Sequence, residues 1–150
     1  KEYNWWTKKD RVNEVEETFI QMVLWAQNSL SAIPEISLFT NEKSILPGIT
    51  AFDTSGHSPG HSSILVESEG SKLIIGGDVF RNTYTSLKNP DFIPDTDMDP
   101  VKAKKTRHEI LDLLTKEKIA YLGYHFPFPG VGHIIAHEKS YEFIPASIRW

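Results

Sequence analysis

Apolar and polar positions repeat along the chain with two different periods, and the first period is helical. Within the first 33 residues, apolar side chains recur at spacings of three and four, which predicts an amphipathic helix. These side chains are Val15, Phe19, Met22, Val23, Ala26 and Leu30. We expect the helix to end before Pro34, because proline has no backbone N–H to continue the hydrogen-bond ladder.

From Ile36 to about Asp78, short runs typical of β-strands replace the helical pattern. The predicted strands are residues 36–40, 49–54, 63–68 and 72–75, with turns at Pro47-Gly48 and Glu69-Gly70 between them. The run Leu73-Ile74-Ile75 is apolar without alternation. We therefore expect this strand to be buried on both faces.

The second half of the chain alternates between strand and helix patterns. Residues 81–98 are polar and contain prolines, which predicts a long loop of the kind that often carries function. Asp99-Pro100 is expected to start a helix, since Asp is a good cap and Pro suits the first helical position. The helix positions expected to face the core are Val101, Ile110, Leu111 and Leu114. Strands are predicted at 119–122, 133–137 and 141–144, and the alternation indicates an α/β layered sandwich.

Length, charge and cysteine content exclude some partners and some kinds of metal site. The 150 residues suffice for one domain with a real core. A net charge of −4 with scattered lysines and arginines argues against nucleic acid as a partner. No apolar run approaches the roughly 20 residues that span a bilayer, so no membrane partner is expected. The absence of cysteine excludes thiolate metal ligands and leaves cytoplasmic, periplasmic and secreted locations open.

Three short motifs carry the candidate chemistry. Gly56-His57-Ser58-Pro59-Gly60-His61 lies between two predicted strands and holds two imidazoles in a tight loop. Gly76-Gly77-Asp78 follows a buried strand, where α/β sheets place ligands. His125 follows the predicted strand 119–122. Taken singly, each has a structural alternative: a surface histidine, a plain turn or a hydrogen-bonded core histidine. Together they place nitrogen and oxygen ligands at strand ends, as a hydrolytic zinc site requires.

The same motifs resemble consecutive motifs of the metallo-β-lactamase superfamily. The tail from Tyr124 to Ile134, Tyr-His-Phe-Pro-Phe-Pro-Gly-Val-Gly-His-Ile, is closer to its methyl parathion hydrolase branch. The resemblance covers residues 1–144 and implies the C-terminal half of a metallo-β-lactamase-type αβ/βα sandwich, a sheet with flanking helices. It implies that residues 1–150 form the C-terminal part of one such domain, and the start at Lys1 fits a cut inside a longer protein.

Carried over residue by residue, the resemblance implies two divalent metal ions, with zinc expected and manganese, iron and cobalt left open. His61 would ligate one metal, Asp78 would bridge both, and His125 would ligate the other. His57 and His133 match motif positions that are not ligands. The family's upstream His-x-His-x-Asp-His motif is absent from this chain, so we expect the fragment alone to be inactive.

The implied activity is hydrolysis of a small-molecule ester, lactone or phosphotriester by a metal-bridging hydroxide, with Asp78 as catalytic ligand. Trp5, Trp6, Phe126 and Phe128 are candidates for the substrate pocket, with core packing as their alternative role. The alternative function is an inactive half-domain that completes a partner chain, namely the missing N-terminal half; a homodimer is left open. A redox relative of the same fold is disfavoured, because both ligand positions are histidine.

Overall fold

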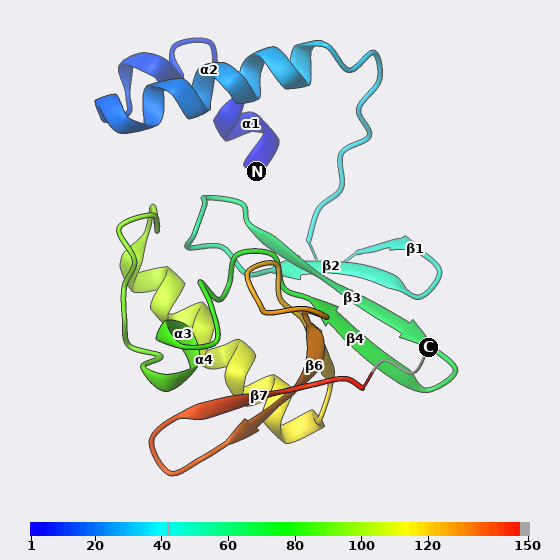
Figure 1. Cartoon of the computed structure of the whole chain (residues 1–150). Coiled ribbons are helices and arrows are strands. Elements are labelled where there is room, and N and C mark those ends of the chain that lie inside the picture. The colour runs from blue at the N-terminus through cyan, green and yellow to red at the C-terminus, as the bar shows by residue number, and fades with distance from the viewer. Residues whose placement is uncertain (42, 148–150) are drawn as a thin grey trace. The chain divides into compact units, whose positions relative to one another are not determined.

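The computed structural model describes residues 1–41 and 43–147, and the chain divides into two compact units, Lys1–Thr40 and Asn41–Trp150 (Figure 1). The N-terminal unit is helical, with α1 (Glu2–Trp6), the short 3-10 helix η1 (Arg11–Asn13) and α2 (Glu17–Ser31). The predicted amphipathic helix is confirmed, and α2 ends shortly before Pro34. The predicted strand at residues 36–40 is wrong: this segment lies at the boundary of the two units and pairs with no described strand.

In the C-terminal unit, the described residues form one seven-stranded sheet in which the strands follow chain order. Its strands are β1 (Ser44–Leu46), β2 (Ile49–Asp53), β3 (Ser62–Ser68), β4 (Ser71–Ile75), β5 (Ala120–Leu122), β6 (Val131–Ala136) and β7 (Tyr141–Pro145). Every pairing among them is antiparallel except that of β4 with β5, which is parallel. The loop between these two strands contains α3 (Thr85–Lys88) and α4 (Pro100–Glu117).

Helix α4 begins as the sequence predicts, with the Asp99 carboxylate accepting a hydrogen bond from the backbone N–H of Lys102 at 3.0 Å. Ile110, Leu111 and Leu114 are buried in the core as expected. Val101 is 80% exposed, so its predicted burial is wrong. The buried stripe of α4 passes through Ala103 and Ile110. At about 100° per residue, Val101 lies about 200° around the helix from Ala103 and so points away from the core.

One face of the sheet packs against α4, and the other face keeps exposed apolar side chains. Ile74, Tyr121 and Ile134 join the core cluster on the α4 face. Ile75 points to the opposite face with its partners Ile64 and Leu122, because paired residues share a face. Ile75 is 37% exposed, so the expected burial of this strand on both faces is wrong. Ile135 and Ile144 lie on that face too and are more than two-fifths exposed.

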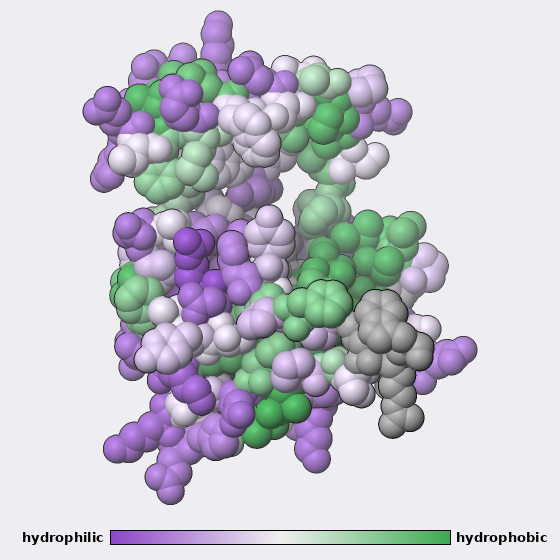
Figure 2. Space-filling model, viewed as in Figure 1, coloured by the Kyte–Doolittle hydropathy of each residue, from purple (hydrophilic) through white to green (hydrophobic). Residues whose placement is uncertain are grey.

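This exposed face carries a prediction about the isolated chain. Contiguous apolar surface drives association, so we expect residues 1–150, expressed alone, to form oligomers or to be poorly soluble. Figure 2 shows further hydrophobic surface over β1 and β2, where Ile45 and Leu46 are exposed. Light scattering coupled to size-exclusion chromatography checks the expectation. A monodisperse monomer with a cooperative melting transition contradicts it.

Candidate functional site

The three predicted ligand residues meet at one edge of the sheet because of the strand directions. Asp78 follows the end of β4 and His125 follows the end of β5, and the parallel pairing brings Ile75 opposite Leu122. His61 comes directly before β3, which is antiparallel to β4, so the start of β3 lies beside the end of β4. All three residues belong to the C-terminal unit. No helix among the described residues is long and apolar enough to cross a bilayer.

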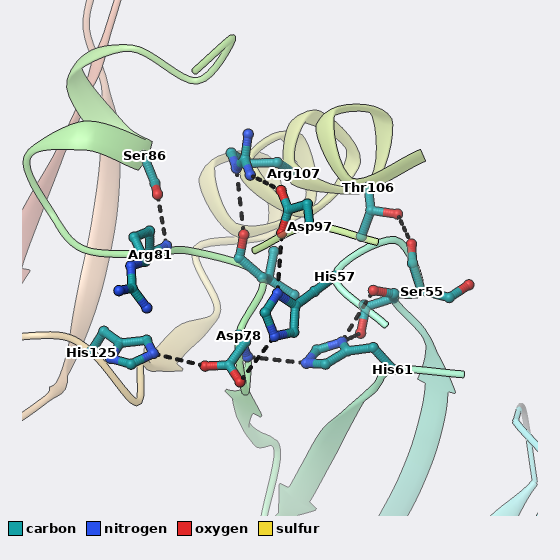
Figure 3. Close-up of polar contacts among 12 residues, drawn as sticks. Ser55, His57, His61, Asp78, Arg81, Ser86, Asp97, Thr106, Arg107 and His125 are labelled. Carbon is teal, nitrogen blue, oxygen red and sulfur yellow. Dashed lines mark hydrogen bonds and ion pairs between the residues drawn. The ribbon is translucent and has the colours of Figure 1, made fainter. Parts of the chain in front are cut away.

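Both histidines contact Asp78 directly, one through its carboxylate and the other through its backbone (Figure 3). His125 Nε2 lies 3.0 Å from Asp78 Oδ1. The backbone N–H of Asp78 donates a hydrogen bond to His61 Nε2 at 3.0 Å. The structure therefore brings together the His–Asp–His set that the sequence motifs single out.

A buried polar chain holds the His61 ring. His61 Nδ1 lies 3.1 Å from the backbone carbonyl of Thr54 and 2.8 Å from Thr54 Oγ1. Because a carbonyl oxygen only accepts, the proton belongs on Nδ1, and Nε2 keeps its lone pair. Thr54 Oγ1 in turn contacts Ser63 Oγ at 2.9 Å, and Ser63 Oγ donates to the carbonyl of Gly76 at 3.1 Å. This tautomer is the one that an imidazole needs to bind a metal through Nε2.

Two glycines let the chain pass close to functional groups. Gly77 has φ of +58°, and a Cβ there would lie 2.7 Å from His61 Nε2. A Cβ on Gly76 would lie 1.8 Å from the Tyr121 hydroxyl.

Burial, with a smaller contribution from the Asp78 carboxylate, raises the pKa of Tyr121 far above its ordinary value. Tyr121 is therefore a neutral phenol at working pH and cannot act as a base.

Histidine 57 also reaches the site, although its motif position does not predict a ligand. Its Nδ1 lies 3.1 Å from Asp97 Oδ1, and its Nε2 lies 3.5 Å from Asp78 Oδ2. Its ring meets the His61 ring edge to face, with centroids 5.9 Å apart. The motif therefore places both of its imidazoles beside Asp78.

A small cavity opens over Asp78. Its lining residues are His57, Asp78, Arg81, Pro94, Thr96, Asp97, Arg107 and His125. Sequence patterns did not single out Arg81, Asp97 or Arg107. Their only signal in the sequence is that Arg81 and Asp97 fall in the predicted long loop. No spacing rule links such loop residues to Arg107, because this helix residue meets them only in the folded chain.

The donor set suits a metal in its chemistry but is incomplete in number. Among residues 1–41 and 43–147, no three His, Asp or Glu side chains are arranged to hold a metal ion. Yet Asp78 Oδ1 is buried and accepts no hydrogen bond from any described residue, although His125 Nε2 lies beside it. A buried carboxylate oxygen without a donor is costly unless a cation compensates it. Two imidazoles and this oxygen are ligands that zinc accepts.

Neither Phe126 nor Phe128 is among the residues that line this cavity. Phe126 is 8% exposed and packs against Phe80, Tyr121 and Phe143, so the structure places it in the core. Phe128, by contrast, is 81% exposed on the loop after His125. Trp5 and Trp6 belong to α1 of the N-terminal unit, and their pocket role stays a prediction.

Comparison with known proteins supports the fold. No family model matches the chain. An N-acyl homoserine lactonase of Bacillus thuringiensis is 31% identical over 104 residues, which are 69% of this chain and 38% of that protein. A crystal structure of a hydrolase in the β-lactamase superfamily matches with a TM-score of 0.86 at 23% identity, over 97% of this chain and 53% of the other. The chain therefore has the metallo-β-lactamase fold.

A second solved structure extends this comparison. A dizinc quorum-quenching lactonase, in complex with a homoserine product, matches with a TM-score of 0.85 at 24% identity, over 97% of this chain and 52% of its own. The predicted α/β fold class and the resemblance to the metallo-β-lactamase superfamily are confirmed. The chain spans 38% of the length of the curated lactonases that it matches and about half of these two structures.

Proposed function

We propose that this chain supplies the C-terminal part of a two-metal hydrolase that opens lactones. The observation that carries the proposal is the meeting of His61, Asp78 and His125 at one sheet edge, with the buried Asp78 Oδ1 lacking a hydrogen bond. The relatives named lactonases support the choice of a lactone over an aryl ester or phosphotriester.

The residues that would hold the metals are His61 and His125 through Nε2 and Asp78 through its carboxylate. When bound, two zinc ions supply a hydroxide at neutral pH and a Lewis acid for the substrate carbonyl. The chain's own part is positional: the Thr54 carbonyl fixes the His61 tautomer, and the cavity over Asp78 opens beside the candidate ligands. Arg81 lines this cavity and is exposed, so its guanidinium is available to bind substrate oxygens.

Three ligands are too few for two metals, so the remaining ligands must come from residues outside this chain. An upstream half with a His-x-His-x-Asp-His motif would provide them. The alternative is a half-domain that completes a partner without catalysis. Metal analysis of the intact protein separates the two, since a non-catalytic half-domain has no need of two zinc ions per molecule.

The substrate assignment is tested with a panel of neutral lactones, aryl esters, phosphotriesters and an anionic thioester. We expect the highest kcat/KM with neutral lactones and the lowest with the anionic thioester, because a net charge of −4 gives no long-range attraction for anions. The Phe128 ring, three residues after the candidate ligand His125, is exposed and available for apolar contact, so Phe128→Ala should raise KM for a long-chain lactone more than for a short one. Preference for the anionic thioester contradicts the assignment, and equal losses on both lactones contradict the role of Phe128.

A further inference from the structure

Two groups of buried polar side chains adjoin the candidate site. One is the ion pair of Arg107 with Asp97, whose side chains are 2% and 3% exposed, with Nη2 3.2 Å from Oδ2. The other is the hydroxyl pair of Thr54 and Ser63, residues that are 2% and 0% exposed. The hydroxyl pair is the more informative group, because it reaches the ring of the candidate ligand His61.

The hydroxyl pair crosses the edge of the sheet at which the candidate ligands meet. Thr54 directly follows β2, Ser63 belongs to β3, and Gly76 directly follows β4. Thr54 Oγ1 lies 2.9 Å from Ser63 Oγ, which donates a hydrogen bond to the carbonyl of Gly76 at 3.1 Å. Gly76 lies two residues before Asp78. The contacts therefore run from His61 to the backbone of the segment that carries Asp78.

Both nitrogens of the His61 ring face backbone groups whose hydrogen-bonding roles are fixed. Nδ1 lies 3.1 Å from the carbonyl of Thr54, and a carbonyl only accepts. Nε2 lies 3.0 Å from the backbone N–H of Asp78, and a backbone N–H only donates. The proton therefore lies on Nδ1 and the lone pair on Nε2. Thr54 Oγ1, 2.8 Å from Nδ1, consequently accepts from the ring.

The protons of the two hydroxyls then follow a single direction. Ser63 Oγ uses its one proton on the Gly76 carbonyl, so it accepts from Thr54 Oγ1. Thr54 Oγ1 uses its own proton on Ser63 and has only lone pairs left for His61. Without Ser63 as acceptor, the Thr54 hydroxyl would be free to turn its proton toward Nδ1. That arrangement favours the tautomer with the proton on Nε2, which leaves Nε2 no lone pair for a metal.

We propose that Thr54 and Ser63 form a one-directional series of hydrogen bonds that holds His61 with its Nε2 lone pair available to a metal. The inference rests on the proposed function, since His61 is one of its candidate ligands. Both hydroxyls act through the imidazole, so Thr54 and Ser63 are positioning residues. Partners that orient a ligand histidine typically contribute about 10- to 100-fold in metal affinity.

The first test is the zinc affinity of the intact protein, measured by competition with a chromophoric chelator. Thr54→Val, which keeps the shape of the side chain but removes the hydroxyl, and Ser63→Ala should each weaken zinc binding by about 10- to 100-fold. Thr54→Ser keeps the hydroxyl and should bind zinc like the wild type. Thr115→Val is the matched control: its hydroxyl donates to the carbonyl of Leu111 within α4 at 2.7 Å, and zinc affinity should not change.

The second test uses the metal-free protein and does not depend on zinc. Histidine-ring ¹⁵N NMR at a pH of about 8.5, where an ordinary imidazole is neutral, should show the His61 proton on Nδ1. In Ser63→Ala, a signal from the tautomer with the proton on Nε2 should appear, because the Thr54 hydroxyl is then free to donate to Nδ1.

Wild-type zinc affinity in Thr54→Val or Ser63→Ala overturns the proposal, with or without a lower melting temperature. A Thr54→Ser variant as weak as Thr54→Val overturns it too, since the hydroxyl would then not be the group that matters, and so does equal weakening in Thr115→Val. In the NMR spectra, a proton on Nε2 in the wild type or an unchanged tautomer in Ser63→Ala also overturns it. If the wild-type protein binds no zinc, the proposed function fails, while the NMR spectra still decide whether the hydroxyl pair sets the tautomer.

Discussion

Replacing Asp78 with alanine in the intact protein should remove bound metal and lower kcat/KM by at least about three orders of magnitude. Asp78 is the side chain at which the candidate ligands converge, because His125 contacts its carboxylate and His61 contacts its backbone N–H. Losing a metal-bound hydroxide and Lewis acid costs several kcal/mol of transition-state stabilisation, and each 1.36 kcal/mol is about tenfold in rate. Elemental analysis of the purified variant and steady-state kinetics with a lactone measure the two effects.

Asp112→Ala is the control for this variant, since Asp112 is an exposed carboxylate on α4 that pairs with Lys116. It should keep the metal and the activity. His61→Ala and His125→Ala should resemble Asp78→Ala, while His57→Ala should lose less metal than any of the three. An Asp78→Ala protein with full metal content and normal turnover would refute the assignment of the site.

Replacing Arg107 with methionine should cost about 3–5 kcal/mol of folding free energy, the usual loss when one partner of a buried ion pair is removed. Asp97 would stay buried without a counter-charge, and the carbonyls of Pro90 and Phe92 would lose their donor. In a protein of this size such a loss lowers the melting temperature by roughly 6–20 °C. Chemical denaturation and thermal melting of the intact protein provide the measurement.

The double variant Arg107→Met with Asp97→Asn tests the cause of that loss. With no charge left in the interior, part of the stability should return, so the double variant should melt above Arg107→Met alone. A single variant that melts like the wild type would show that Arg107 is not an essential partner of Asp97. A double variant less stable than either single variant would mean that the lost stability comes from the unpaired carbonyls of Pro90 and Phe92 instead.

Local signals in the sequence were sufficient where short-range chemistry decides the structure. Asp99-Pro100 starts α4 because a cap and a preset φ act within one turn. The convergence of His61, Asp78 and His125 was also predictable, because each borders a strand and strand directions bring those strand ends together.

Features that depend on distant partners were not predictable from the pattern. Phe126 looked like a pocket residue beside His125, yet its ring packs with Phe80 and Phe143, which lie far away in the sequence. Strand β1 was missed because its short run Ser44–Leu46 has no alternation to reveal it and forms by pairing with β2. Asp97 and Arg107 meet only after α4 docks, and an ion pair between a loop and a helix leaves no periodic trace in the sequence.

The parallel pairing of β4 with β5 also bears on how the protein folds. The other described pairings join strands that are neighbours in the sequence through short connections, and they can form early as hairpins. The parallel pair must wait for the long crossover through α3 and α4, whose closure entropy slows the step. Since that closure is what brings Asp78 to His125, a chain that captures metal between them has completed this crossover. Metal capture would then report folding of this unit, and dissolved zinc would stabilise the finished fold by mass action.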